Sequence, residues 1–406
     1  MSAQKIFTRT IWTLSLVSLF NDISSEMLYP VMPIYLKSIG FTALWIGILE
    51  GVAEAVVGLS KGYFGKLSDE KGRRLPFVQL GYFLSAIAKS MLALFAQPLW
   101  VLLARTSDKL GKGIRTSARD AMLSDESSKE NKGKVFGFHR AMDTIGAAIG
   151  PLLALVYLYF HPQDYKTLFF IAFAPSMFSV LLTLLIKESK RSPTLALPIG
   201  EGKNIESPSR WEGFRMGRFF SYFSYWKKSS GEYRGLIIGL LLFALFNSSD
   251  IFLLLMAKNA GISDEKIILV YVFYNLVYAL FSLPFGHLAD KLGMKKTFVF
   301  GLILFCITYT GIAFLQNTIM LVALFFVYGM FAAASEGISK AWIAKIAPKG
   351  ETATAIGFHA STSSIATMIA SSLAGLIWVS SNPQMTFMVS AAGGFLALIY
   401  FLIRTK

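Results

Sequence analysis

The sequence has few of the residues that most enzyme chemistry requires. Its 406 residues include one cysteine, Cys306, and four histidines. A single cysteine excludes an internal disulfide and a cysteine metal cluster, and its place in an apolar run indicates a thiol packed inside a membrane. The sequence also lacks a phosphate-binding glycine loop, a dinucleotide fingerprint, a nucleophile elbow and a metal-ligand motif. These absences predict a protein that is not an enzyme and that uses no cofactor and no metal ion.

Charged residues are also scarce. They make up 16% of the chain against 54% hydrophobic residues, and the mean hydropathy is +0.55. A soluble chain of this length would be less apolar. The net charge of +15 would favour a nucleic-acid partner in a soluble protein. Here, however, the basic residues lie in short loops beside apolar segments, as the positive-inside rule expects. The chain is therefore expected to reside in a lipid bilayer, without a nucleic-acid partner.

Twelve apolar segments are long enough to cross a bilayer. Six lie near residues 9–36, 44–65, 76–96, 98–121, 134–160 and 167–186, and six near 235–257, 265–288, 297–315, 319–345, 352–379 and 385–403. The first segment follows basic residues, as a signal peptide does, but it continues through Asp22 and Glu26 without a small-residue cleavage site. We interpret it as an uncleaved span. The pattern predicts an all-α membrane protein of twelve transmembrane helices, with six-helix bundles at 1–186 and 235–406.

Residues 187–234 separate the two sets of spans. This segment is rich in serine, proline and charge, so it cannot cross the bilayer, and its end from Trp211 to Lys228 combines aromatic and basic residues. We predict a cytosolic linker. Its tail suits a helix lying at the lipid headgroups, and a merely sticky linker is the alternative.

The basic loops alternate along the chain. Counting from a cytosolic start places 66–74, 129–134, the linker, 291–296, 345–349 and the C-terminus on one side, whereas the opposite loops carry few basic residues. The positive-inside rule then predicts a multi-pass protein of the cytoplasmic (inner) membrane with both termini in the cytosol. We expect a monomer.

One charged loop motif occurs in both halves. Its order is glycine, three residues, aspartate, two residues, glycine and then basic residues, and the two aspartates lie 290 minus 69, or 221, positions apart. Two unrelated basic turns would not share this order, so the repeat predicts one fold unit used twice around a pseudo-twofold axis. The motif residues are Gly65, Asp69, Gly72, Arg73 and Arg74, and then Gly286, Asp290, Gly293 and Lys295.

The paired motifs, the twelve spans and the central linker resemble the major facilitator superfamily of secondary transporters over nearly the whole chain. This resemblance implies that Asp69 and Arg73 clamp a cytosolic gate by pairing with neighbouring helix ends. Glu70 stands where the family usually has a basic residue, which is expected to weaken or rewire the clamp. Leu28 to Pro33 and Gly146 to Pro151 resemble the Pro pair and the Gly-Pro motif of drug:proton antiporters. Gly146, Gly150 and Pro151 are therefore also assigned to the gate.

The fourth span carries cations on one face. Ionisable residues inside a bilayer cost about 2.5 to 3.5 kcal/mol even on insertion scales, so they face a cavity or a partner. We interpret Arg119 and Asp120 as part of a solvated cytosolic turn, and Asp108 and Lys112, one turn apart, as a neutralising pair. Arg105 and Arg115 are therefore the better candidates for a substrate site. The face comprises Arg105, Asp108, Lys112, Arg115 and Arg119.

Carboxylates inside the spans are candidates for proton coupling. Asp22 and Glu26 lie one turn apart in the first span, and desolvation favours the protonated form of a carboxylate. Ion pairing with the cations of the fourth span is the alternative for these two residues. The full set of candidate proton sites is Asp22, Glu26, Glu50, Glu54 and Asp143.

Two histidines occupy equivalent places in the halves. His139 and His359 are 220 positions apart and each follows Gly-Phe. Only Asp143 stands near His139 at ligand spacing, so both histidines are interpreted as gate or packing residues and not as metal ligands. A proton relay between His139 and Asp143 is an alternative. In the second half, Glu336 and Lys340 are expected to pair with each other, and recognition is expected mainly in the first half.

We predict a secondary active transporter that moves a small organic solute by alternating access coupled to protons. Because the cations predicted to be buried outnumber nearby acids, the solute is expected to be anionic: a carboxylate, a polycarboxylate siderophore or a phosphate ester. The alternatives are efflux of lipophilic drugs by proton antiport and a non-transporting receptor or lipid-handling protein. The predicted substrate-binding residues are Arg105, Lys112, Arg115, Arg140, Asn247, Asn275 and Glu336.

Overall fold

The computed structural model describes residues 6–29, 31–41, 43–188 and 221–404. Within these ranges it leaves out the side chains at 33, 34, 37, 43–54, 221, 251, 264, 265, 268 and 404. Glu50 and Glu54 therefore lie outside the described side chains. Most of the predicted linker, residues 189–220, lies outside the described residues.

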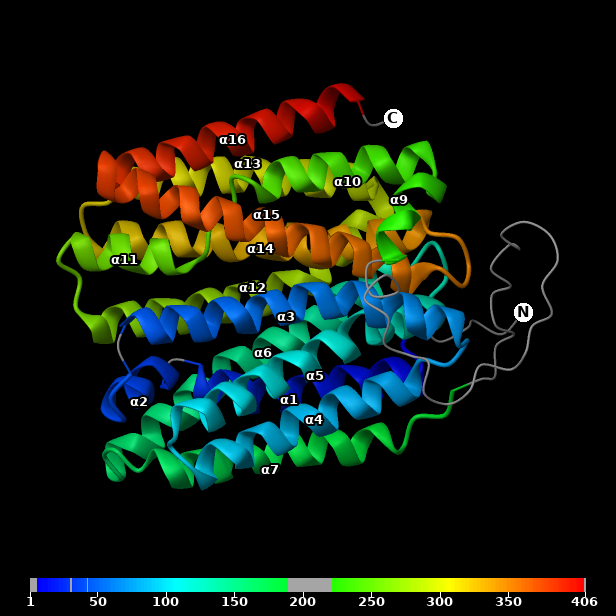
Figure 1. The fold of residues 1–406 in the computed structure, drawn as a ribbon. Helices are drawn as coiled ribbons and strands as arrows, with labels where there is room; N and C mark the ends of the chain where they lie inside the picture. The colour runs from blue at the N-terminus through cyan, green and yellow to red at the C-terminus, as the bar shows by residue number, and fades with distance from the viewer. Residues whose placement is uncertain (1–5, 30, 42, 189–220, 405–406) are drawn as a thin grey trace.

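The fold is all-α, with two sets of six spans lying side by side (Figure 1). The first half comprises α1 (Arg9–Leu28), α2 (Met32–Ser38), α3 (Ala43–Glu70), α4 (Leu75–Leu94), α5 (Pro98–Asp125), α6 (Lys132–Phe160) and α7 (Tyr165–Thr183). The second half comprises α10 (Gly231–Ala244), α11 (Ile251–Asn259), α12 (Asp264–Leu292), α13 (Met294–Ala313), α14 (Thr318–Ile346), α15 (Thr352–Ser380) and α16 (Pro383–Arg404). The predicted fold of twelve transmembrane helices in two bundles is confirmed.

The first span of each half is broken at a similar place. In the first half, α2 resumes at Met32, next to the prolines at 30 and 33, which disfavour helix in the residue before them and lack an N–H. In the second half α11 resumes at Ile251, after Asn, Ser, Ser and Asp, whose side chains compete for backbone hydrogen bonds. Each of these predicted spans therefore consists of two helices.

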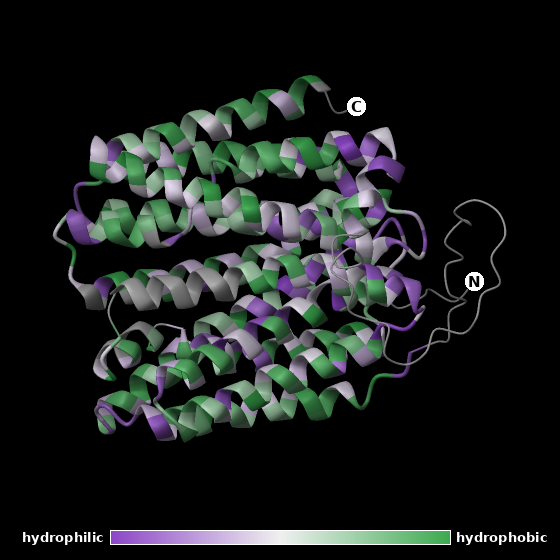
Figure 2. Ribbon diagram, in the orientation of Figure 1, coloured by the Kyte–Doolittle hydropathy of each residue, from purple (hydrophilic) through white to green (hydrophobic). Residues whose placement is uncertain are grey.

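Hydrophobic residues dominate the long helices, and hydrophilic residues gather at one end (Figure 2). Eight described helices are long and apolar enough to cross a membrane by length and composition. Helix α5 is not among them because of its many charged residues, yet Arg105, Arg115, Arg119 and Asp120 are all buried. These four side chains therefore point into the protein and not into lipid, as the cost of a charge in hydrocarbon requires.

The two most extensive helix crossings between the bundles are those of α3 with α15 and of α6 with α12. Small residues at both crossings let the backbones approach closely. A Cβ on Gly65 would lie 2.5 Å from the carbonyl oxygen of Ala353, and one on Gly357 would lie 2.5 Å from that of Lys61. At the other crossing, Gly133 and Gly137 face Gly286. We call the end of the molecule that carries the two loop motifs the motif end.

We predict that Gly357→Ala pushes α3 away from α15, because the new methyl group would meet the Lys61 carbonyl. Gly375→Ala, on the same helix, is the matched control, since a Cβ there would lie 3.8 Å from Phe252. Alanine is favoured over glycine in a helix by about 1 kcal/mol, so the control should be neutral or stabilising. Thermal unfolding in detergent measures both; equal midpoints for the two variants would contradict the close approach.

Candidate functional site

Each motif aspartate caps a helix of the opposite bundle. Asp69, at the end of α3, accepts hydrogen bonds from the backbone N–H of Thr354 (2.7 Å) and from its hydroxyl (2.8 Å), in the first turn of α15. Asp290, at the end of α12, accepts from the N–H groups of Gly133 and Lys134 (both 2.8 Å), in the first turn of α6. The first turn of a helix has unpaired N–H groups and a positive dipole end, so it binds a carboxylate well.

The arginine that pairs with Asp69 is Arg74 and not Arg73. This corrects the expectation that Arg73 takes part in the clamp. Arg74 is buried, donates to Asp69 (2.8 Å) and pairs with Asp125, whereas Arg73 is exposed. Glu188 then accepts from the backbone N–H groups of Arg74 (2.7 Å) and Leu75 (2.9 Å) at the start of α4. The first motif is thus tied to the beginning of the linker.

The other motif positions lie beside this clamp. Glu70 is exposed and pairs with Lys66 at 3.5 Å. Its negative charge, which is unusual at this position, is therefore directed away from the clamp. Gly72 and Gly293 adopt positive φ angles of 61° and 103° in the turns after α3 and α12. Only glycine tolerates such angles readily, which explains its place in both motifs.

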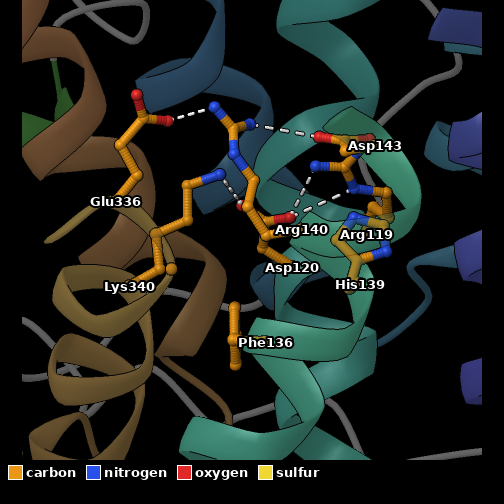
Figure 3. Close-up of a pocket in the computed structure, with 9 residues that line it drawn as sticks. Arg119, Asp120, Phe136, His139, Arg140, Asp143, Glu336 and Lys340 are labelled. Atoms are coloured by element: carbon orange, nitrogen blue, oxygen red, sulfur yellow. Dashed lines mark hydrogen bonds and ion pairs between the residues drawn. The ribbon is translucent and has the colours of Figure 1, made fainter. Parts of the chain in front are cut away.

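A charge network lies between the bundles (Figure 3). It is buried at Arg119, Asp120 and Asp143 and becomes exposed at Glu336. Arg119 donates to Asp120 (2.9 Å), and Lys340 of α14 pairs with the same carboxylate at 2.8 Å. Asp120 is fully buried and Arg119 is 7% exposed. The interpretation of these two residues as a solvated turn was therefore wrong: their α5 face is covered by α6 and α14.

Arg140 forms the second half of the network. It pairs with Asp143 at 3.2 Å, with Glu336 across the seam, and donates to the hydroxyl of Tyr278. Glu336 and Lys340 were expected to pair with each other, but their described ion pairs run to Arg140 and Asp120 of the other bundle. Buried charges are tolerated when they are paired. Three cations here face three carboxylates, so the network is balanced.

The network leaves little free space. Its residues, with Phe136, His139 and Gly337, enclose about 10 Å³, which is room for about one water molecule. His139 is buried beside it, with its ring nitrogens 3.4 and 3.5 Å from the hydroxyls of Ser15 and Ser18. His359 lies 3.0 Å from the hydroxyl of Ser363. The space that these described residues line is therefore too small for an organic substrate.

Several predicted substrate cations are engaged inside the first bundle. Arg115 donates to Ser85 (2.6 Å) and lies over the ring of Tyr82, 4.5 Å from its centroid. Asp108 pairs with Lys89 of α4 at 3.7 Å, not with Lys112 as its spacing suggested. Arg105 is also buried on this helix. Lys112 differs from these residues because it is exposed at the middle of α5.

The candidate proton sites Asp22 and Glu26 are half-buried on α1. The amide of Asn21 donates to Asp22 (3.1 Å), and Lys112 lies within electrostatic range of both carboxylates. The glycines assigned to the gate pack against this helix: a Cβ on Gly146 would lie 2.5 Å from the carbonyl of Leu19, and one on Gly150 would lie 2.5 Å from that of Ile23. The motif that ends in Pro151 thus brings α6 onto α1 within one bundle.

A second polar cluster surrounds Asp250 at the break between α10 and α11. It includes Asn247 and Asn275, two of the predicted substrate-binding residues, but its tyrosines were not singled out from the sequence. The hydroxyl of Tyr328 donates to Asp250 (2.6 Å), and the ring of Tyr274 stacks on that of Tyr328 at 5.1 Å. Tyr309 lies 3.5 Å from the amide oxygen of Asn247, and Asn275 donates to the carbonyl of Tyr271. The spacing of Tyr271, Tyr274 and Tyr278 along one helical face was the available signal. Polar clusters inside the spans therefore occur in both halves.

Comparison with known proteins gives consistent results. The family profile described as Major Facilitator Superfamily matches residues 14–256 and 236–406. An uncharacterized MFS-type transporter of Methanocaldococcus jannaschii is 33% identical over 398 residues, covering 97% of this chain and 93% of that protein. Shorter matches include Citrate exporter 1 of Aspergillus niger (24% identical; 44% of this chain, 35% of that protein) and the quinolone resistance protein NorA of Staphylococcus aureus (24%; 41% and 42%).

Solved structures share the fold. The human organic anion transporter MFSD10 aligns with a TM-score of 0.81 at 16% identity, covering 97% of this chain and 99% of that one. The transporter FucP in its outward conformation aligns with a TM-score of 0.75 at 12% identity, covering 99% of this chain and 100% of that one. At these identities the likeness shows the fold alone.

We predict that Asp69→Asn opens the motif end more often, because it weakens the charged cap on α15. Hydrogen bonds to charged groups contribute about 1.5 to 3 kcal/mol each. Glu70→Gln is the matched control, since that neighbouring carboxylate makes only an exposed pair worth about 0 to 1 kcal/mol. Thiol labelling of a cysteine placed at Ala353, which is fully buried at the crossing of α3 and α15, reports access to the seam in a Cys306→Ser background. Equal labelling rates in the two variants would count against the clamp.

Asp120→Asn should lower the free energy of unfolding by about 3 to 5 kcal/mol, because it leaves Arg119 and Lys340 facing each other without a full partner. The double variant Asp120→Asn with Lys340→Met should recover part of this loss, since it removes one of the two cations. Denaturant titration in detergent measures both. A loss in the double variant equal to the sum of the losses in Asp120→Asn and in Lys340→Met alone would show that the two residues do not interact.

Proposed function

This chain belongs to the major facilitator superfamily, a family of membrane transporters and not of enzymes, and we propose that it moves a small organic anion by alternating access coupled to protons. The proposed substrate classes are a carboxylate, a polycarboxylate siderophore and a phosphate ester. We further propose a monomer in the cytoplasmic membrane with both termini in the cytosol, so that the motif end faces the cytosol. The bundles 1–186 and 235–406 and the linker 187–234 are part of the same proposal.

The observation that carries the proposal is the placement of Lys112 relative to Asp22 and Glu26. Lys112 is exposed at mid-helix, and the two carboxylates of α1 lie within its electrostatic range. When the carboxylates are ionised they compete with an anionic substrate for this cation; when they are protonated the cation is available. Proton binding and anion binding at this place are therefore linked in free energy.

The positive charge inside the spans is paired with carboxylates more fully than the sequence suggested. Lys89, Arg119, Arg140 and Lys340 are each paired with a carboxylate, so they do not form a surplus of positive charge. Support for an anion therefore rests on Lys112. The names of a weakly related citrate exporter and of an organic anion transporter with the same fold are in keeping with this class of substrate.

A second candidate function is the efflux of lipophilic cationic drugs. The tyrosine cluster around Asp250 favours it, because aromatic faces beside a carboxylate attract organic cations. The partial similarity to NorA is in keeping with this alternative. A non-transporting receptor or lipid-handling protein, the third possibility, draws no support from residues 221–228 of the linker, where Tyr222 and Tyr225 are buried on the protein.

A ligand screen by thermal shift separates the two candidates. We expect citrate, as the probe anion, to raise the unfolding midpoint, since a ligand at about 100 times its Kd contributes about 2.7 kcal/mol to the folded state. Lys112→Ala should abolish this shift, and Lys166→Ala, at an exposed position in the first turn of α7, should keep it. A shift with tetraphenylphosphonium and none with citrate, phosphate esters or other carboxylates would favour drug efflux.

We predict that Asp22→Asn and Glu26→Gln abolish accumulation driven by a pH gradient while leaving exchange of substrate for substrate. A neutral side chain at either position no longer binds and releases the coupled proton, but the passage itself remains. The control is Glu130→Gln, which removes an exposed carboxylate at the motif end. Uptake of labelled citrate into proteoliposomes measures both activities. Retention of gradient-driven accumulation by both variants would refute the coupling assignment.

A further inference from the structure

The chain immediately before α10 packs tightly on the protein, although it lies outside the spanning helices. This segment consists of a 3-10 turn, η1 (Ser221–Ser224), and the short helix α9 (Tyr225–Lys228). Tyr222 is only 1% exposed and Tyr225 only 6%. Aromatic residues anchored at lipid headgroups would keep one face toward the lipid. The described end of the linker is therefore seated on protein.

The seat of Tyr222 lies where the two bundles touch. Its ring packs against Gly62 of α3, and the backbone N–H of Gly62 donates to the hydroxyl of Ser361 of α15 (3.1 Å). A Cβ on Gly62 would lie 2.4 Å from the Tyr222 ring and 2.7 Å from the Ser361 hydroxyl. Only a glycine at position 62 leaves room for the ring beside both helices.

The neighbouring aromatic residues anchor the segment to the second bundle. Trp226 stacks on Phe358 of α15 at 5.9 Å, and Tyr225 meets Tyr233 of α10 edge-on at 5.2 Å. The first half has an equivalent anchor: Phe7, ahead of α1, packs on Phe138 at 4.8 Å, and Phe138 and Phe358 are 220 positions apart. Both anchors stay within one bundle, whereas Tyr222 reaches the other bundle.

We propose that Tyr222 is a latch that stabilises the closed motif end. Its seat is built from α3 and α15 together, so the seat exists only while these helices touch. A contact made in one of two states shifts their equilibrium by its full free energy. Opening of the motif end therefore requires Tyr222 to leave its seat, and the linker takes part in setting the balance of the two states. The proposal rests on alternating access, but it needs no knowledge of the substrate.

The test is a distance measurement between the bundles by pulsed electron paramagnetic resonance. Nitroxide labels at Lys129→Cys and Lys349→Cys, in a Cys306→Ser background, occupy exposed loops of opposite bundles, 220 positions apart at the motif end. We expect Tyr222→Ala to lower the ratio of short to long distances by about tenfold or more, since burial of a large side chain contributes on that order. Tyr222→Phe should retain the ratio of the parent protein, because the ring fills the seat. Tyr222→Leu, which keeps apolar volume there, should give an intermediate shift.

Phe7→Ala is the matched control, because it removes an equivalent aromatic anchor that does not bridge the bundles. The seat is tested from its other side by Gly62→Ala, whose methyl group would meet the ring. Its effect should shrink in the Tyr222→Ala background, where the ring is gone. An unchanged distance ratio in Tyr222→Ala and Tyr222→Leu, an equal shift in Phe7→Ala, or an equal effect of Gly62→Ala in both backgrounds would each overturn the latch. Because no ligand is added, failure of the anion screen would leave this result unaffected.

Discussion

The interaction on which the rest of the structure depends is the carboxylate cap that each bundle gives to a helix of the other. Asp69 caps α15 and Asp290 caps α6, each on backbone N–H groups at 2.7 to 2.8 Å. Backbone donors cannot swing away as side chains can, so the caps fix the register of the two crossings. The glycine contacts beside the caps then bring α3 onto α15 and α6 onto α12. The charge network deeper in the seam is held between these two crossings.

Much of this arrangement could be predicted from the sequence. The lengths of the apolar segments gave twelve spans, and the repeated loop motif gave two equivalent bundles, because helix length and loop chemistry are local properties of the chain. The same repeat singled out Asp69 and Asp290, each of which lies at a helix end of the opposite bundle. The prolines before Met32 and the polar residues before Ile251 also indicate helix breaks, although each of the two spans was predicted as one continuous helix.

The pairing of the charges could not be predicted. Helical spacing places Asp108 beside Lys112 and Glu336 beside Lys340, but the described pairs reach other helices, to Lys89, Arg140 and Asp120. Long side chains choose among several neighbours once the helices pack, and desolvation favours whichever pairing leaves no buried charge alone. The choice of Arg74 over Arg73 has the same cause, since only Arg74 points into the protein. The tyrosines around Asp250 were overlooked because they carry no charge.

We infer that the Asp69 cap on α15 and the Asp290 cap on α6 form and break together in one two-state closure of the motif end. Hydrogen–deuterium exchange of the backbone amides of Gly133 and Lys134, in α6, tests it in a protein with Asp69→Asn, which touches only the other crossing. If the two crossings open together, exchange at the Gly133 and Lys134 amides accelerates along with exchange at Thr354. Faster exchange at Thr354 with unchanged protection at Gly133 and Lys134 would contradict it.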